Sequence, residues 1–376
     1  MRIGVDANPL LTPRPGGIEI YLAELVTRMP RLGRGHEFHL YFNYCRSRNH
    51  ATVMRFVQEG VRARICRIPP QILNPLHWRL GLPVDWLTGP VDVMFYASFV
   101  ALPQNRGQKV VSIHDLIPLT HPEFCQPDHV RDFELRVPPS LNRADAVIVV
   151  SAYTGGLVQE RFGLPADRVR CIPNGVHERF HPAEDVEGIQ GVAARYGIQP
   201  PYLLFVGTME PRKNLVRLVE AFGRTGSGPV REHTLVLAGK PVWGAEELHA
   251  AVARMGADVR IRMPGYVATD DLPALYAGAT AFLFPSLVEG FGIPPLEAMA
   301  CGCPVLTSAT PALIEVVGDA AMTVDPHDTD AIAEGIRRLV EDRDLRDRLR
   351  TRGVRRAKEF SWDRTAAETL AVLEAV

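Results

Sequence analysis

Two carboxylates frame the segment EGFGIPPLE, which runs from Glu289 to Glu297 shortly after the apolar run AFLFP. Pro294 and Pro295 suit the first turn of a helix, so Glu297 is expected just inside that helix. Carboxylates can accept hydrogen bonds from hydroxyl groups such as those of a hexose and a ribose. Favourable interaction of Glu297 with the helix dipole is a structural alternative, and it can act alongside binding.

A glycine-rich backbone separates the two glutamates. Gly290 and Gly292 permit a tight main chain that can approach a ligand closely. The amides that can then point together at one phosphate are those of Phe291, Gly292 and Ile293. A phosphate cradle between two hydroxyl-binding carboxylates indicates a site for a nucleotide sugar.

Two adjacent cations, Arg212 and Lys213, follow the apolar run YLLFVG. Cations at the carboxyl end of a strand and beside a helix start suit a diphosphate, because each charge-assisted hydrogen bond contributes about 1.5–3 kcal/mol. A surface Arg-Lys pair is the structural alternative. Gly16 and Gly17 follow the first strand in the same way, and their amides can approach an anion at a helix N-terminus. A plain strand-to-helix turn is sufficient to explain that Gly-Gly pair.

His114 and Asp115 stand at the end of the apolar run KVVSI. A histidine there could donate to a developing oxyanion or to a sugar hydroxyl. A structural cap is the alternative for this pair. His121 could extend it to a metal site, but no third ligand follows at a suitable spacing, so no metal site is predicted.

Short apolar runs alternate with helical stretches along the chain, which predicts parallel sheets covered by helices. A polar stretch, HERFHPAEDVEGIQ, divides the pattern into two doubly wound α/β units, and a chain of 376 residues is long enough for two cores. In such sheets ligands bind at the carboxyl ends of the strands, where the residues above are expected. The expected strands are RIGVD, FHLYF, VDVMFY, KVVSIHD and AVIVV, then YLLFVG, HTLVLAG, VRIRMPG, AFLFP, PVLTS and AMTVD.

A formal net charge of −1 and a balanced composition argue against disorder and against a general nucleic-acid binder. The charge is uneven, because residues 28–79 hold ten arginines against only Glu37 and Glu59. This segment predicts contact with an anionic partner such as a membrane surface, and a merely solvated face is the alternative. The six cysteines show no CxxC spacing, so neither a zinc ribbon nor a disulfide framework is expected.

The chain begins with Met1 and passes directly into a strand pattern, without the apolar core of a signal peptide. No run of about 18 apolar residues occurs elsewhere in the sequence. A cytoplasmic protein is therefore expected, with peripheral contact at the inner face of the membrane if the arginine-rich segment binds there.

At these residues the sequence resembles the retaining nucleotide-sugar glycosyltransferases of family 4. The resemblance rests on the glutamate pair around GFGI, the Gly-Gly loop, the His-Asp pair, IPNGV at 172–176 and PRKN, in the family's order. It implies the α/β fold called GT-B, in which two Rossmann-like domains face each other across a cleft. The implied domains are 1–180, an acceptor-side domain joined by a returning helix at 361–376, and 198–360, a nucleotide-sugar domain.

The resemblance also implies a role for each matching residue. Glu289 would bind the donor hexose, and Glu297 would bind the nucleotide ribose. Arg212 and Lys213 would neutralise the diphosphate together with amides of Gly16, Gly17 and the segment from Phe291 to Ile293. His114 would contact the transferred sugar, and Tyr266 and Val267 would contact the base. Many members carry an arginine where this chain has Thr208, which leaves more of the phosphate charge to Arg212 and Lys213.

The chemistry implied is transfer of a hexose with retention of the anomeric configuration, without a metal or another cofactor. The motifs are most similar to the bacterial mannosyltransferases of O-antigen and other surface polysaccharides, which implies GDP-mannose as donor and a glycan on polyprenyl diphosphate as acceptor. A GT-B epimerase acting on UDP-GlcNAc, a hexosyltransferase using a UDP-sugar and a non-catalytic sugar-nucleotide binder remain alternatives. A dinucleotide oxidoreductase is disfavoured, because no G-x-G-x-x-G follows either opening strand.

Overall fold

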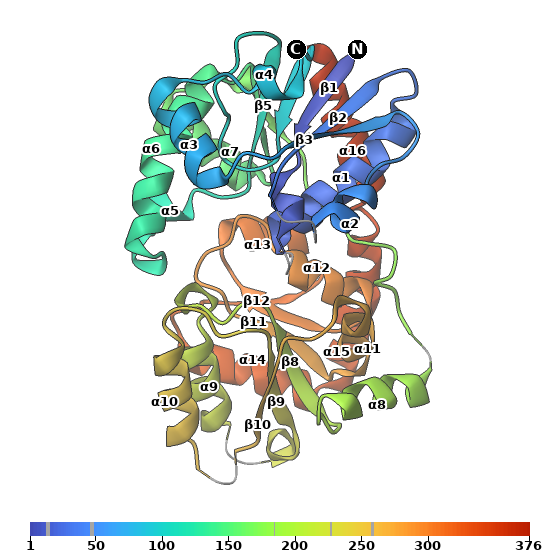
Figure 1. Cartoon of the computed structure of the whole chain (residues 1–376). Coiled ribbons are helices and arrows are strands. Elements are labelled where there is room, and N and C mark those ends of the chain that lie inside the picture. The colour runs from blue at the N-terminus through green and yellow to red at the C-terminus, as the bar shows by residue number, and fades with distance from the viewer. Residues whose placement is uncertain (13–15, 46–48, 184, 226–227, 257–258) are drawn as a thin grey trace. The chain divides into compact units, whose positions relative to one another are not determined.

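The computed structural model describes residues 1–12, 16–45, 49–183, 185–225, 228–256 and 259–376 (Figure 1). The chain forms two compact units. One comprises Met1–Gly175 with Trp362–Val376, and the other comprises Val176–Ser361. In the part of the chain that the structure describes, no helix combines the length and the apolarity needed to cross a bilayer.

The first unit is built on a parallel sheet of seven strands in the order β3-β2-β1-β4-β5-β6-β7. The order reverses at β1, which pairs with both β2 and β4. The strands are β1 (Arg2–Asp6), β2 (Glu37–Asn43), β3 (Val61–Cys66), β4 (Val93–Tyr96), β5 (Gln108–Ile113), β6 (Ala146–Val149) and β7 (Val169–Cys171). The helices are α1 (Gly17–Leu32), α2 (Asn49–Met54), α3 (Pro70–Leu80), α4 (Asp85–Thr88), α5 (Ile117–Thr120), α6 (Pro127–Arg143), α7 (Ala152–Phe162) and α16 (Trp362–Ala375).

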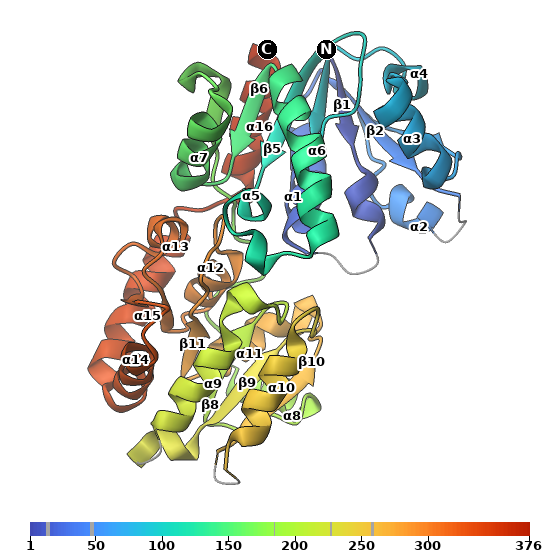
Figure 2. The same ribbon diagram turned by 90° about the vertical axis from the view of Figure 1, so that its left-hand side faces the viewer.

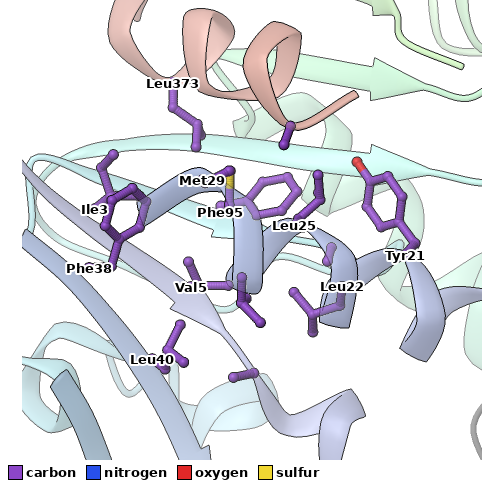
Figure 3. Close-up of a cluster of buried hydrophobic side chains, with 14 of the residues drawn as sticks. Ile3, Val5, Tyr21, Leu22, Leu25, Met29, Phe38, Leu40, Phe95 and Leu373 are labelled. Atoms are coloured by element: carbon purple, nitrogen blue, oxygen red, sulfur yellow. The ribbon is translucent and has the colours of Figure 1, made fainter. Parts of the chain in front are cut away.

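Both faces of this sheet are buried, which explains why its central strands are continuous apolar runs. In β4, Phe95 belongs to a core that includes side chains of α1 and α16, whereas Met94 points into a core that includes side chains of α6 and α7. Figure 3 shows Leu25 of α1 and Leu373 of α16 in the first of these cores, beside Phe95. In Figure 1, α1 lies with α16 on one side of the sheet.

The C-terminal helix α16 packs into the first unit, although it follows the second unit in sequence. Trp362 is fully buried, and its ring meets the ring of Tyr21 edge to face with centroids 6.1 Å apart. Thr365 Oγ1 donates a hydrogen bond to the carbonyl oxygen of Pro173 at 2.7 Å. These contacts fix the last helix beside α1.

The second unit is built on a parallel sheet of six strands in the order β10-β9-β8-β11-β12-β13, and here the order reverses at β8. Figure 2 shows the helices that cover this sheet. The strands are β8 (Tyr202–Val206), β9 (Thr234–Ala238), β10 (Ile261–Gly265), β11 (Ala281–Phe284), β12 (Val305–Ser308) and β13 (Met322–Val324). The helices are α8 (Val186–Arg195), α9 (Leu215–Arg224), α10 (Ala245–Arg254), α11 (Leu272–Gly278), α12 (Ile293–Ala300), α13 (Pro311–Val317), α14 (Thr329–Glu341) and α15 (Arg343–Ala357).

Every strand expected from an apolar run is present, so the predicted fold class of two parallel α/β units is confirmed. Sequence reasoning missed β3 and β7, which lie at the two edges of the first sheet. Only the two ends of β3 are buried, and the strand exposes Arg62 and Arg64, as an edge strand can. The second unit begins at Val176 rather than at 198, because the polar stretch there contains the start of α8, which packs against α11.

Candidate active site

The side chains of Arg212, Lys213 and Glu289 form one buried ionic cluster in the second unit. Arg212 Nη1 donates to Glu289 Oε2 at 2.6 Å, and Lys213 Nζ donates to Glu289 Oε1 at 2.6 Å. Glu289 is 8% exposed and Lys213 is 6% exposed. Lys213 Nζ also lies 4.6 Å from the centre of the Phe284 ring. The two cations predicted to bind the diphosphate and the carboxylate predicted to bind the hexose are therefore in direct contact.

The sheet topology explains this meeting. Arg212 and Lys213 lie in a short 3₁₀ turn after β8, and Glu289 follows β11, which is the neighbour of β8 in the sheet. The backbone amide of Leu287 donates to the carbonyl oxygen of Arg212 at 2.8 Å. Because the order of the strands reverses at this pair, the cluster lies at the topological switch point, where α/β sheets bind ligands.

Asn214 holds the surrounding loops together. It adopts the left-handed conformation, with φ of 60°, between the 3₁₀ turn and α9. Its Nδ2 donates to the carbonyl oxygens of Pro285, at 3.0 Å, and Pro326, at 2.7 Å. The loops that follow β8, β11 and β13 are thus tied to one buried side chain, which sequence reasoning did not identify.

The cluster keeps Glu289 ionised. Burial of this carboxyl opposes ionisation, but the positive charges of Arg212 and Lys213 outweigh burial and lower its pKa to about 2. Burial and the nearby Arg212 lower the pKa of Lys213, and Glu289 works against that shift. Arg212 also pairs with Glu210, whose Oε1 lies 2.6 Å from Nη2. The two cations thus keep Glu289 ionised. Each cation in turn already pairs with a carboxylate.

The glycine-rich segment forms the start of α12. Gly292 caps this helix with φ of 120°, and a Cβ there would lie 2.6 Å from Leu313 Cδ2. Glycine suits this position, because a φ of 120° is strained for any residue that carries a Cβ. Phe291 is buried beside it, against the ring of Phe360. The backbone at 290–293 therefore stands at a helix N-terminus, as the sequence predicts.

Glu297 has the opposite environment to Glu289. It is buried inside α12, and the hydroxyl of Tyr276 from α11 donates to its Oε2 at 3.1 Å. Burial raises the pKa of Glu297 to about 8, although Tyr276 and the charge of Arg179 lower it. The carboxyl is thus largely protonated at neutral pH in the protein alone. No pattern in the sequence points to Tyr276 as its partner.

The predicted base-contacting residues follow β10. Tyr266 is 48% exposed, whereas Val267 is buried. Lys240, which follows β9, places its Nζ 5.7 Å from the centre of the Tyr266 ring. An exposed aromatic ring beside a cation provides a surface on which a base can stack. Lys240 was not predicted, since a single lysine after a strand has no distinctive spacing.

In the first unit, His114 follows β5 and is held by its neighbours. Its Nε2 lies 2.8 Å from the carbonyl oxygen of Ala97, and since a carbonyl only accepts, Nε2 carries the proton. Burial lowers the pKa of His114, so the ring is neutral at pH 7 with Nδ1 as an acceptor. The structure thus favours acceptance from a sugar hydroxyl over donation to an oxyanion. The Oδ1 of Asp115 instead accepts from the amide of Ile117 at 3.0 Å, a local turn just before α5.

The Gly-Gly pair stands at the start of α1, as the sequence predicts. Gly16 is the cap residue, and its amide donates to Glu19 Oε2 at 2.8 Å, while Gly17 is the first helical residue. A phosphate at the Gly16 amide must therefore displace the carboxylate of Glu19. Sequence reasoning did not assign Glu19, which closes the helix start in the manner of a capping box.

Comparison with known proteins agrees with this architecture. The family model described as Glycosyltransferase Family 4 matches residues 15–180, and the model described as Glycosyl transferases group 1 matches residues 194–356. Over its full length the fold is similar to that of Anabaena Alr3699/HepE in complex with UDP and glucose, with a TM-score of 0.77 and 20% identity, and the match covers all of both chains. WaaG, a glycosyltransferase involved in lipopolysaccharide biosynthesis, gives a TM-score of 0.71 at 15% identity over 99% of each chain. The two parallel-sheet units thus define a glycosyltransferase of the GT-B fold.

Sequence relatives narrow the class. The O-antigen chain mannosyltransferase B of Escherichia coli is 35% identical over 280 residues, which are 74% of this chain and 73% of that protein. A serotype-specific mannosyltransferase WbdA of Escherichia coli is 31% identical over 73% of this chain, but the match spans only 36% of that longer protein. A D-inositol 3-phosphate glycosyltransferase of Streptomyces bingchenggensis is 31% identical over 98% of this chain and 87% of that protein. The chain belongs to glycosyltransferase family 4 and is a hexosyltransferase of the O-antigen mannosyltransferase type.

The raised pKa of Glu297 makes a prediction about stability. Between pH 4.5, the ordinary value, and about pH 8, the folded protein keeps a proton that the unfolded chain has lost. The free energy of unfolding therefore falls as pH rises through this window, by up to about 1.4 kcal/mol per pH unit. Glu297→Gln has no carboxyl to titrate at this position, so it lacks this dependence on pH. The free energy of unfolding of the variant should therefore rise relative to that of the wild type as the pH increases from 5 to 8. Chemical denaturation without ligand measures this difference.

Glu289→Gln is the matched control. The carboxyl of Glu289 has a lowered pKa, and this stabilises the wild type relative to the variant above pH 4.5. That stabilisation is lost as the pH falls towards about 2. A stability difference between Glu297→Gln and the wild type that stays constant from pH 5 to pH 8 would contradict the assigned protonation.

Proposed function

We propose that this enzyme transfers mannose from GDP-mannose, with retention of configuration and without a metal, to a glycan carried on polyprenyl diphosphate. The observation that carries the proposal is the buried contact of Arg212 and Lys213 with an ionised Glu289 at the switch point of the second sheet. The mannosyltransferase relatives support the choice of mannose and of an O-antigen type of acceptor.

When the donor binds, the charged side chains of this cluster change their partners. The diphosphate takes the charges of Arg212 and Lys213, supported by the backbone amides at the start of α12. Glu289 then turns its charged oxygens to hydroxyls of the hexose. Glu297, buried one turn into α12, meets the ribose through its carboxyl. Tyr266 stacks on the base.

The same cations assist bond cleavage. Negative charge grows on the departing diphosphate, and fixed cations in a water-poor site stabilise that charge without reorganising. A divalent metal is then unnecessary. The acceptor hydroxyl attacks the face from which the diphosphate leaves, so the diphosphate oxygen is close enough to take its proton. His114 accepts a hydrogen bond from the transferred sugar.

The arginine-rich segment supports contact with an anionic membrane surface. Arg62 and Arg64 are exposed on β3, with the partly buried Ala63 between them, and Arg31 and Arg34 are exposed at the end of α1. Arg62 lies 3.2 Å from Glu37, so part of the charge is paired within the protein. Arg46 and Arg48 lie outside the described residues. Contact at the cytoplasmic face would bring the enzyme to a lipid-linked acceptor.

A transfer assay in EDTA tests the reaction. We expect mannosyl transfer from GDP-mannose at an unchanged rate after chelation, because cations of the protein stabilise the leaving group. NMR of the product should show the anomeric configuration of the donor. Loss of activity that magnesium restores, or an inverted product, contradicts the mechanism. Parallel assays with UDP-glucose and UDP-GlcNAc show whether the enzyme uses a different donor. Isomerised sugar formed from the donor alone identifies an epimerase.

Replacement of Glu289 tests the site. Glu289→Gln keeps the size of the side chain but removes the charge that orients the hexose, and we expect transfer to fall by about 10²-fold. Glu334→Gln on α14 is the matched control, because this exposed glutamate pairs only with Arg337 of its own helix among the described residues. Normal transfer by Glu289→Gln overturns its role.

Vesicle flotation tests membrane contact. We expect the protein to float with vesicles that contain acidic lipid and not with neutral ones, and the fraction bound should fall as salt rises. The double variant Arg62→Gln, Arg64→Gln should float less well. The control is Arg343→Gln, Arg348→Gln on the exposed side of α15. Equal flotation with acidic and neutral vesicles refutes the contact.

A further inference from the structure

The backbone at 290–293, which we call the cradle, packs against two neighbouring elements. The ring of Phe291 meets the ring of Phe360 edge to face, with centroids 5.9 Å apart, and both side chains are buried. Gly292 lies against Leu313 of α13, so close that a Cβ at this glycine would stand 2.6 Å from Leu313 Cδ2. The position of the cradle therefore depends on the positions of Phe360 and α13.

Arg356, near the end of α15, contacts both of these neighbours. Its guanidinium carbon lies 4.8 Å from the centre of the Phe360 ring. Its Nε donates to the carbonyl oxygen of Val316 at 3.0 Å, and its Nη2 donates to that of Glu315 at 2.6 Å. Both carbonyls belong to the last turn of α13, where the helix itself supplies no amide to bond them. One side chain thus holds both neighbours of the cradle.

This set of contacts requires an arginine. A planar guanidinium can donate from two nitrogens to two acceptors while its face stacks on an aromatic ring. The remaining nitrogen of Arg356, Nη1, donates to the carboxylate of Glu359. The side chain is only 28% exposed, so it is largely enclosed by these partners. A lysine carries the same charge on a single nitrogen and cannot make these contacts together.

The amides of the cradle need such support. Amides at the start of α12 have no partner within that helix, so the packing of the backbone sets their direction. A phosphate binds most tightly to donors that are already aligned, because ordering them on binding costs free energy. A side chain that fixes both neighbours of the cradle can therefore change the affinity for a phosphate without contacting it.

We propose that Arg356 is a positioning residue for donor binding, which fixes Phe360 and α13 and thereby aligns the amides at 291–293 for the diphosphate. The proposal rests on the proposed function, because it takes the cradle to bind a nucleoside diphosphate. It adds that part of the affinity for the donor is set in α15, by a side chain whose contacts are with the protein itself.

Arg356→Lys tests this role, because it keeps the charge and removes the paired hydrogen bonds. We expect the Kd of the full chain for GDP, measured by calorimetry without acceptor, to rise about fivefold to tenfold. Phe360→Leu interrupts the same link at the ring and should also raise this Kd. The rise in the double variant should be smaller than the product of the two single rises, because both changes act through one contact.

Arg346→Lys is the matched control on the same helix. Arg346 Nη1 donates to the carbonyl oxygens of Leu339, at 2.8 Å, and Val340, at 2.6 Å, in the last turn of α14. This variant also leaves two carbonyls without their donor, so it should lose thermal stability as Arg356→Lys does. Its Kd for GDP should equal that of the wild type, because Arg346 holds a different helix.

Three results would overturn the proposal: an unchanged Kd in Arg356→Lys, an equal rise in Arg346→Lys, or a rise in the double variant that equals the product of the single rises. If Arg356→Lys does not fold, Phe360→Leu decides by itself. UDP replaces GDP as the probe if the wild type binds UDP more tightly. Binding of neither nucleotide by the wild type refutes the proposed function, whereas nucleotide binding without transfer from GDP-mannose refutes that function and leaves the role of Arg356 intact.

Discussion

The buried ionic contact of Glu289 with Arg212 and Lys213 is the constraint on which the second unit's site depends. Removing ions from water costs several kcal/mol each, and only close opposite charges offset that cost. The charges must therefore remain together, which requires the loops after β8 and β11 to keep a fixed separation. The double hydrogen bond of Asn214 and the bond from Leu287 to Arg212 provide that restraint. The protein itself therefore holds both cations in position.

One motif holds two glutamates with opposite protonation. Glu289 is buried beside two cations and has a pKa of about 2, whereas Glu297 is buried beside the neutral Tyr276 and has a pKa of about 8. Burial acts on both in the same direction, so the difference comes from the neighbouring charges. The same residue type thereby provides a permanent anion at one end of the motif and a neutral carboxyl at the other. A protonated Glu297 can donate as well as accept, which widens the contacts available to a diol.

The sequence was sufficient for the central strands and for the location of the candidate residues, because buried parallel strands are apolar runs and their carboxyl ends share an edge. It was insufficient for β3, an edge strand of the first sheet in which solvation interrupts the apolar run. It also did not reveal which side chains pair. The contacts of Tyr276 with Glu297 and of Lys240 with Tyr266 join residues far apart in the sequence, at spacings that no periodicity encodes.

The two units share a topology but differ in the charge at their switch points. In the second unit that point carries Arg212 and Lys213, which suit a diphosphate. In the first unit that point carries the acidic Asp6, at the end of β1. A fold of this kind fixes where ligands bind, and the few residues after the strands fix which charge is accepted.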